Sequence, residues 1–366
     1  MDEIKEIVKT LTDWRKAYYN GEPKVSDAEF DDLEDQLRQL DPENEYFDGI
    51  GEDDSGNFPK AKHVLLMGSQ DKCNTVEDIV KKLKHFAGKK VALIVEPKCD
   101  GLSLELNYKN GKASMHITRG DGYEGDDITV NAAKMQGVPA TIPTTDDVSF
   151  RGEILLLHSD KDKYFPELKN CRNGASGISK NKDGIGCEHL TVITYDCQYL
   201  DEDKSFETEA NKLDFLTASG FQRVNADMVI ADCTSNEGIL KAANDLMEKM
   251  NEFTMADREY DTDGVVVKLN VIDENDVRTE LKPKTQWAIK PARVEVETTL
   301  TDIEWNMTNG TLVPVGVFEP VVLDGATIQR ASLANPAQIE SMGLYIGARI
   351  RVSRRNLVIP HIEGLA

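Results

Sequence analysis

The sequence contains no pair of cysteines spaced as Cys-x-x-Cys. Its six cysteines stand singly at positions 73, 99, 171, 187, 197 and 233, so it indicates neither a zinc ribbon nor a disulfide framework. It also contains no run of about 18 apolar residues, the minimum for a membrane-spanning helix. The opening Met1-Asp2-Glu3 is acidic, unlike the basic, apolar start of a secretion signal. These absences favour a protein of the reducing cytoplasm without a membrane partner.

Basic residues are also scarce, since 43 Lys and Arg face 65 Asp and Glu and give a net charge of −22. A charge of this sign argues against nucleic-acid binding, which depends on cations beside phosphates. The acidic excess is uneven, however, because residues 1–60 sum to −11 and residues 201–261 to −9. Basic clusters at residues 278–293 and 349–355 suffice for local phosphate contacts. We expect the acidic segments to face away from any nucleic acid.

The most informative motif is Lys98-Cys99-Asp100-Gly101, which follows an apolar, strand-like run over residues 91–97. A lysine becomes a nucleophile when its amine loses a proton, and partial burial beside other cations lowers its pKa. Taken alone, Lys-x-Asp-Gly is more typical of an exposed hairpin turn. The neighbouring Cys99 is expected to be a packed, inert thiol.

Three further motifs change this interpretation, because they follow in order and each lies at the end of a strand-like run: Arg151-Gly152-Glu153, Asp263 to Lys268, and Trp287 to Lys290. Together they favour covalent nucleotidyl transfer, with Lys98 attacking an α-phosphate and Lys268, Lys290 and a bound Mg²⁺ balancing the negative charge. Glu153 is the candidate for holding the waters of the metal or a ribose. Glu96, extended by the following proline, is placed to accept a hydrogen bond from an adenine amine.

At this point the sequence resembles a known family, the NAD-dependent DNA ligases of bacteria and some of their phages. The resemblance covers nearly the whole chain. The segment at Lys98 looks like the adenylated-lysine motif, and residues 118–131 and 151–153 are similar to the segments that follow it. Residues 170–177 resemble an Asn-Pro-Arg-Asn-Ala-Ala-Ala-Gly stretch, with the proline and two of the alanines replaced. Lys180 stands where the family usually has arginine, which keeps the charge but loses the bidentate fork.

The N-terminal segment resembles the small helical cap that distinguishes NAD-using members from ATP-using ones. The resemblance implies that this cap holds the nicotinamide mononucleotide half of NAD, through residues that suit a flat cation. The matching positions are Tyr18, Tyr19, Asp27, Phe30 and Asp31. A plain amphipathic helical hairpin explains the same segment, and both interpretations can hold together.

The resemblance also assigns residues beyond the strand-end motifs. Asp100 joins Lys98, Glu153, Lys268 and Lys290 as a catalytic residue. The cofactor residues are Ser69, Gln70, Glu96, Arg119 and Glu153, although an ordinary turn explains Ser69 and Gln70 nearly as well. The residues expected at DNA or phosphate are Arg172, Lys180, Arg354 and Arg355.

The pattern of strands and helices predicts an α+β fold in three parts. Residues 1–60 are expected to form the helical cap, residues 61–293 the nucleotidyltransferase domain with antiparallel and mixed sheets, and residues 294–366 a partial OB-type barrel. Asn110-Gly111 predicts a hairpin turn. A Gly-x-Gly-x-x-Gly match at residues 120–125 is expected to be a loop leading into a helix, since four acids in and after it would repel a pyrophosphate.

The favoured function is a DNA ligase that uses NAD and Mg²⁺, has no zinc site, and acts on nicked double-stranded DNA. Lys98 takes AMP from NAD, AMP passes to a 5′-phosphate, and the 3′-hydroxyl displaces it. Two alternatives stay open. One is an RNA ligase or capping-type enzyme that uses ATP or GTP, and the other is a non-catalytic DNA-binding scaffold subunit.

The last eight residues, 359–366, match a segment inside the family's barrel. We therefore expect a barrel with an unpaired strand edge, which invites pairing with another chain. A second polypeptide would then complete the barrel and the DNA clamp. The isolated chain is expected to adenylate itself well and to seal nicks poorly, because fewer phosphate contacts lower its affinity for DNA.

Overall fold

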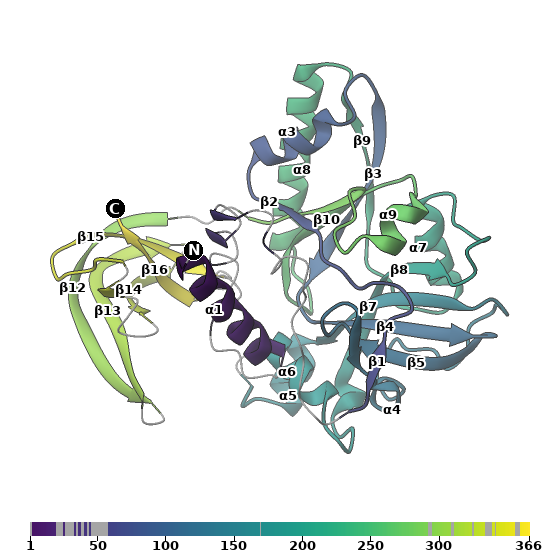
Figure 1. Ribbon diagram of the computed structural model, residues 1–366, viewed down its shortest axis with the longest axis horizontal. Helices are drawn as coiled ribbons and strands as arrows, with labels where there is room; N and C mark the ends of the chain where they lie inside the picture. The colour runs from purple at the N-terminus through teal and green to yellow at the C-terminus, as the bar shows by residue number, and fades with distance from the viewer. Residues whose placement is uncertain are drawn as a thin grey trace. The chain divides into compact units, whose positions relative to one another are not determined.

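The computed structural model describes residues 2–19, 58–168, 170–291, 295–308, 311–323, 326–333, 339–340, 342–355 and 359–366, with single positions 25, 33, 36, 37, 40, 41 and 44. The chain divides into two compact units, which are described separately (Figure 1). One comprises Arg15–Pro23 and Glu43–Pro291, and the other Met1–Trp14, Lys24–Pro42 and Ala292–Ala366. The N-terminal helix α1 is Asp2–Tyr19.

The larger unit is built on two sheets. The strands of the first are β2 Asp71–Cys73, β3 Lys90–Cys99, β9 Asp227–Asp232, β10 Thr262–Leu269 and β11 Gln286–Ile289. They lie in the order β2-β11-β10-β3-β9 and are antiparallel except for the parallel pair β2 and β11. The strands of the second are β4 Leu102–Lys109, β5 Lys112–Thr118, β7 Val148–Leu156 and β8 Leu190–Tyr199. They are antiparallel in the order β5-β4-β7-β8.

Seven helices and a 3-10 turn accompany these sheets in the described part of this unit. They are α3 Val76–Lys84, α4 Thr129–Ala132, α5 His158–Tyr164, α6 Cys171–Ser179, α7 Glu209–Ala218, α8 Asn236–Met255, α9 Glu274–Thr279 and the turn η2 Cys187–His189, of which α4 spans a single turn. Side-chain caps fix where the main helices start, since Thr75, Thr208 and Ser235 each accept a hydrogen bond from the backbone N–H three residues on. Apolar spacing in the sequence predicts helices over residues 207–219 and 236–250, and α7 and α8 confirm both.

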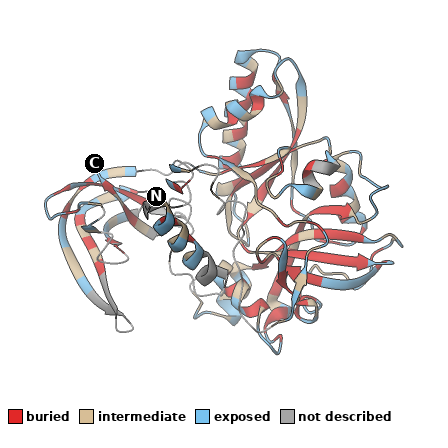
Figure 2. Cartoon of the chain, in the orientation of Figure 1, coloured by how far each residue is buried: buried red, intermediate tan, exposed pale blue. Residues whose placement is uncertain are grey.

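The first sheet separates an apolar face from a polar one by simple strand alternation. Leu93 and Val95 of β3 pack with buried residues of α3 and α8 in one core. Glu96 and Lys98 occupy the alternate positions of β3 and therefore point to the opposite face of the strand. Figure 2 shows this burial along the strands. The apolar run before Lys98 thus anchors the strand on one side and presents chemistry on the other.

The second sheet follows the same rule. Leu104, Leu106 and Phe150 lie in its apolar core, and the alternate positions carry polar groups. Among these, Glu105 is fully buried, accepts a hydrogen bond from Ser149 Oγ at 3.0 Å and pairs with His63 at 2.8 Å. Buried polar groups of this kind persist only when they are bonded to one another, so this face is a polar layer with a defined structure.

The predicted hairpin turn is confirmed. Asn110 and Gly111 connect β4 to β5 with φ angles of 48° and 71°. Both lie in the left-handed region that a tight two-residue turn of this kind requires. A Cβ on Gly111 would also come within 2.4 Å of the Thr144 carbonyl oxygen.

The Gly-x-Gly-x-x-Gly match forms no dinucleotide loop after a parallel strand. Its last part lies in β6, Glu124–Asp126, which pairs antiparallel with β1, Lys60–Lys62. The chain then enters the single-turn helix α4, and the Asp127 carboxylate accepts the Thr129 backbone N–H at 3.0 Å. The expected loop leading into a helix is confirmed.

The smaller unit contains the predicted barrel. Its strands are β12 Glu295–Thr308, β13 Thr311–Leu323, β14 Ala326–Ser332, β15 Arg349–Arg355 and β16 Ile359–Leu365. The expectation of an unpaired edge is wrong, because these strands form a closed barrel in the order β12-β13-β14-β16-β15. The last strand pairs with both β15 and β14, and β15 pairs with β12. The sequence pattern did not predict β14 and β16. These two strands pair although they are far apart in the sequence, and their pairing closes the barrel.

Candidate active site

The candidate site lies where the polar ends of three strands of the first sheet meet. Lys98 is the last residue but one of β3, Asp263 is the second residue of β10, and Lys290 follows β11. The Lys98 ammonium lies 3.3 Å from one carboxylate oxygen of Asp263, and the Lys290 ammonium lies 2.9 Å from the other. Antiparallel pairing of β3 with β10 produces this contact between residues 165 positions apart. The two predicted lysines are thus brought together by a carboxylate that sequence reasoning did not assign to the site.

Asp263 is recognisable in retrospect from its place in the predicted Asp-Gly-Val-Val-Val-Lys motif. Gly264 follows it at a φ of 150°, and a Cβ there would come within 2.3 Å of the Ile289 carbonyl oxygen. The glycine therefore permits the close approach of β10 and β11 that sets Asp263 between the two lysines. Burial opposes the ionisation of Asp263, but Lys98 and Lys290 outweigh it and hold the pKa of this carboxyl below its usual range.

The charge state of Lys98 differs from the expectation. Burial alone lowers the pKa of its amine, but the carboxylates of Asp263, Glu153 and Asp100 outweigh burial and raise the pKa above its ordinary value. The expected lowering of this pKa is therefore wrong, because acids surround Lys98. These acids favour the protonated amine.

Glu153 lies on the polar face of the second sheet. Ser103 Oγ donates a hydrogen bond to its carboxylate at 2.9 Å. Burial raises the pKa of Glu153 to about 7, although Lys98 and Ser103 act in the opposite direction. Arg119 belongs to the same electrostatic environment, and its buried Nε has no hydrogen-bond partner among the described residues. A buried carboxyl with a raised pKa, beside a cationic donor whose Nε has no described partner, is suited to binding a polar ligand.

Glu96 and Lys268 form a buried ion pair at 2.8 Å. Burial raises the pKa of Glu96 to about 7, and Lys268 opposes this shift. Lys268 also donates to the Tyr195 carbonyl oxygen of the second sheet at 2.8 Å. The second carboxylate oxygen of Glu96 is buried without a described hydrogen-bond partner, so it can accept an N–H from a ligand. Lys268 thus contacts Glu96, and the structure does not pair it with Asp263 as it does Lys98 and Lys290.

A second group of buried ion pairs lies next to Lys268, and the sequence did not predict it. Lys212, whose side chain is 1% exposed, pairs with Asp196 at 2.9 Å and with Glu209 at 3.0 Å. Asp196 also contacts Arg151 at 3.4 Å, and Glu209 lies 4.0 Å from Lys268. These ion pairs connect Arg151 and Lys268, which both belong to motifs found in the sequence. The connecting residues come from β8 and α7. A small cavity opens beside them, lined by Asp196, Glu209, Lys268, Leu269, Thr285 and Gln286.

Asp100 is held from two directions. Its backbone N–H donates to the Asp261 carbonyl oxygen at 3.0 Å, and its carboxylate pairs with Arg172 near the start of α6. The following Gly101 allows close packing, since a Cβ there would lie 2.2 Å from the Ile154 carbonyl oxygen. The Lys-x-Asp-Gly motif is therefore a bend locked between the two sheets, and the exposed-turn alternative is wrong.

The remaining predicted site residues occupy varied places. Lys180 pairs with buried Asp126 at 3.2 Å, and its side chain is 11% exposed. The backbone N–H of Ser69 donates to the Leu281 carbonyl oxygen at 2.7 Å, and Gln70 is partly buried. The side chains at the other predicted positions lie outside the described residues, and these positions are Tyr18, Tyr19, Asp27, Phe30, Asp31, Arg354 and Arg355.

This arrangement has a defined chemical capacity. It places a lysine amine beside another lysine and several carboxylates, in a polar layer between two sheets. Such a site can form a bond from nitrogen to an electrophilic phosphorus and can bind the charges that develop. The site and fold therefore define a class of proteins suited to lysine-based group transfer.

The comparison with known families narrows this class. The family model described as the NAD-dependent DNA ligase adenylation domain matches residues 55–290, and that of the NAD-dependent DNA ligase OB-fold domain matches residues 297–366. The chain belongs to the NAD-dependent DNA ligase family.

Curated relatives agree with this assignment. The chain is 37% identical to a DNA ligase of Treponema denticola, an alignment that covers 99% of this chain and 57% of that protein. It is 34% identical to a DNA ligase of Treponema pallidum, covering 99% and 44%, and 34% identical to one of Sorangium cellulosum, covering 98% and 56%. The chain thus spans about half the length of the curated relatives it matches.

Proposed function

We propose that this chain carries out the nucleotidyl-transfer chemistry of an NAD-dependent DNA ligase, with Lys98 as the nucleophile. The observation that supports this most is the contact of Lys98 and Lys290 with the two oxygens of Asp263 at the meeting point of three strands. In the proposed reaction the Lys98 amine loses a proton and forms a bond to the α-phosphorus of NAD. The bond from that phosphorus to the bridging oxygen breaks, and nicotinamide mononucleotide leaves.

The later steps are part of the same proposal. AMP passes from Lys98 to the 5′-phosphate at a nick in double-stranded DNA, and the 3′-hydroxyl then displaces AMP to join the backbone. Arg172, Lys180, Arg354 and Arg355 are proposed to contact phosphates. Arg172 and Lys180 face Asp100 and Asp126 in the free protein, so these two must exchange an acid for a phosphate when DNA binds.

The proposed roles follow the contacts. The free oxygen of Glu96 accepts the adenine amine, while Arg119, Ser69 and Gln70 line the nucleotide site. Lys268 and Lys290 balance charge on the phosphate, and Asp100 holds the bend that carries Lys98. Among these groups, Glu96 has a carboxylate oxygen and Arg119 has an Nε that lack a hydrogen-bond partner in the described part of the chain.

Mg²⁺ is proposed to bind through water at Glu153. A carboxylate oxygen suits this hard cation, and a bound cation would favour the ionised form of Glu153, which burial disfavours. When bound, the ion supplies positive charge that offsets the acids around Lys98 and so favours the unprotonated amine. Glu153 holds this position through its hydrogen bond from Ser103.

The organisation proposed for the chain is a helical cap at residues 1–60, a nucleotidyltransferase domain at 61–293 and an OB-type barrel at 294–366. The cytoplasm of a bacterial cell is the proposed location, because the relatives are bacterial and all six cysteines are buried and unpaired. Among the described residues, no helix combines the length and the apolar content that crossing a bilayer requires. Closure of the barrel removes the reason for proposing a second polypeptide that completes it.

Labelling decides between NAD and other nucleotides. We expect the purified chain, incubated with Mg²⁺ and NAD labelled in its adenylate half, to carry the label through denaturing electrophoresis. Labelled ATP and GTP should give none. Labelling by ATP or GTP would instead support an RNA ligase or capping-type enzyme, and a folded chain that takes label from none of the three would support the scaffold subunit.

A second experiment separates the cap from the rest of the chain. Because Tyr19 and Asp27 are proposed to touch only the leaving half of NAD, Asp27→Ala should slow self-labelling by about 10- to 100-fold, the effect of losing a hydrogen bond to a charged group worth roughly 1.5–3 kcal/mol. Sealing of a nick that already carries AMP should change little. Asp13→Ala, at an exposed position of α1, is the matched control. An equal loss in both assays would mean that Asp27 has a structural role.

A further inference from the structure

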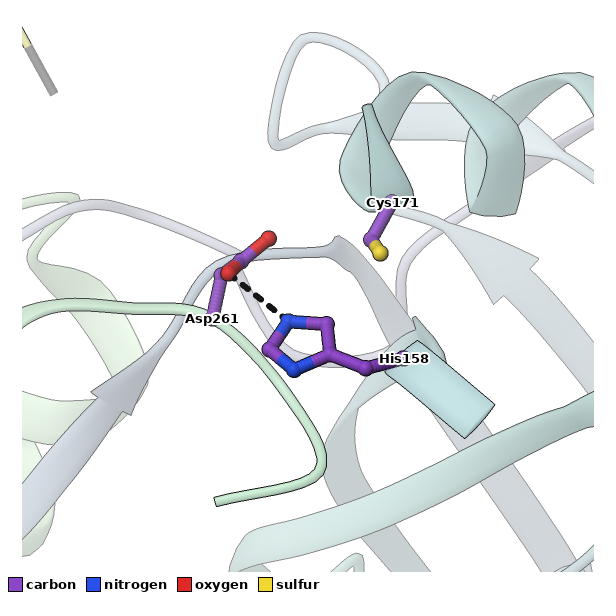
Figure 3. A group of neighbouring side chains, drawn as sticks. All are labelled: His158, Cys171 and Asp261. Carbon is purple, nitrogen blue, oxygen red and sulfur yellow. Dashed lines mark hydrogen bonds and ion pairs between the residues drawn. The ribbon is translucent and has the colours of Figure 1, made fainter. Parts of the chain in front are cut away.

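Beside the proposed active site lies a cluster of three potential metal ligands from three separate segments. His158 is the first residue of α5, Cys171 is the first residue of α6, and Asp261 directly precedes β10. The His158 Nε2 lies 2.9 Å from an Asp261 carboxylate oxygen, and the donor atoms of all three residues lie within 4.8 Å of one another. Figure 3 shows the thiol and the imidazole pointing toward the same space.

We propose that His158, Cys171 and Asp261 bind one divalent transition-metal ion, with Zn²⁺ as the ion that fits best. Imidazole nitrogen, thiolate sulfur and carboxylate oxygen are the three donor types that Zn²⁺ takes in proteins. A thiolate and a carboxylate together neutralise its two positive charges. Three protein ligands leave a fourth position for water, as in an open tetrahedral site.

The dimensions of the cluster suit this ion. Bonds of about 2.0–2.3 Å to a tetrahedral ion place the donor atoms roughly 3.3–3.8 Å apart. The donor atoms of the three residues lie within 4.8 Å of one another, so small side-chain movements suffice to reach these separations. The side chains of His158 and Asp261 are free to move, since they are 43% and 46% exposed, whereas Cys171 is buried and fixed. The exposed pair also provides the route by which an ion enters from solvent.

The ligands can change partners when a cation binds. Without an ion, the His158 and Asp261 side chains satisfy one another through a hydrogen bond. When the ion binds, the imidazole proton moves to Nδ1 so that Nε2 donates its lone pair, and the thiol proton leaves to solvent. The exchange requires no oxidant or reductant.

The position of the cluster gives the ion a structural consequence. The backbone carbonyl of Asp261 accepts the Asp100 N–H, and Cys171 is followed by Arg172, which pairs with the Asp100 carboxylate. An ion bound to both Asp261 and Cys171 would therefore tie together the two segments that hold Asp100 from either side. This inference concerns binding alone and holds whether or not the proposed ligase chemistry is correct.

Cobalt provides the test. The full chain, freed of metal with a chelator, is titrated with Co²⁺ as a spectroscopic substitute for Zn²⁺. We expect one equivalent to bind, with the near-ultraviolet absorption of a thiolate bound to cobalt, and Zn²⁺ to displace it. Absence of that absorption would overturn the proposal, because Cys171 is the buried anchor of the site.

Variants locate the ion. Cys171→Ser should abolish the thiolate absorption, and His158→Ala should weaken Zn²⁺ binding by at least about 100-fold, since loss even of an outer-shell partner costs up to this factor. Cys233→Ser and His189→Ala, at positions outside the cluster, should leave both unchanged. Circular dichroism shows whether Cys171→Ser and His158→Ala are folded. If one of them is not, Asp261→Asn, which keeps the shape of the side chain, takes its place. Equal absorption and affinity in wild type and folded cluster variants would show that the ion binds elsewhere.

Discussion

Replacing Lys98 with alanine is expected to abolish covalent transfer of AMP from NAD while leaving the protein folded. Removal of a covalent nucleophile typically costs on the order of 10⁶ in kcat, which places labelling below detection. The fold should survive because Asp263 keeps its ion pair with Lys290 at 2.9 Å. The measurement is retention of label from NAD through denaturing electrophoresis, beside circular dichroism of the same samples.

Two further variants make this result specific. Lys98→Arg keeps a cation beside Asp263 but cannot give up its proton, so it should fail as completely as alanine if the lysine acts as a nucleophile. Lys89→Ala, an exposed lysine just before the same strand, should label like the wild type. Substantial labelling of the arginine variant would assign Lys98 an electrostatic role and move the covalent bond to another residue.

The largest expected effect on stability comes from Lys212, which lies outside every motif of the sequence. Its ammonium is the partner of both Asp196 and Glu209 in a buried setting. Removal of one partner of a buried ion pair typically costs about 3–5 kcal/mol, because it leaves an uncompensated charge away from water. Lys212→Met should therefore lower the free energy of unfolding of the larger unit by about this amount, as measured by urea denaturation.

The control for this variant is Lys241→Met. Lys241 forms an exposed pair with Asp245 at 2.7 Å within α8, and exposed pairs of this spacing contribute only about 0.3–0.5 kcal/mol. A small effect of Lys212→Met, similar to that of the control, would show that Arg151 and Lys268 compensate for the missing cation at Asp196 and Glu209.

The position of the candidate site could be predicted from the sequence because local pattern determines it. The apolar run before Lys98 specifies a buried strand, and strand alternation sends Glu96 and Lys98 to one face and Leu93 and Val95 to the other. Caps at Thr208 and Ser235 likewise fix where α7 and α8 begin. Each of these signals acts within a few residues of the chain.

The charge state of Lys98 depended on partners that no local sequence pattern indicates. Pairing of β3 with β10 brings Asp263 to Lys98, and it is this contact, with Glu153 and Asp100, that raises the Lys98 pKa. The sequence identified cations near Lys98 but gave no count of the acids facing it. Since the pKa depends on the balance of burial and neighbouring charge, its direction required the three-dimensional arrangement.

By itself, then, the sequence determined the strand-end lysines, the hairpin at Asn110-Gly111 and an α+β fold that ends in a barrel, because propensity, alternation and turn chemistry are local. Only the tertiary structure decided that Lys268 pairs with Glu96, that β16 closes the barrel on β14 and β15, and that His158, Cys171 and Asp261 converge. The absence of Cys-x-x-Cys spacing argued against zinc in the sequence, whereas the three proposed ligands lie up to 103 positions apart. Such contacts form where strands and helices that are distant in the sequence pack together. The spacing of residues along the chain does not encode this packing.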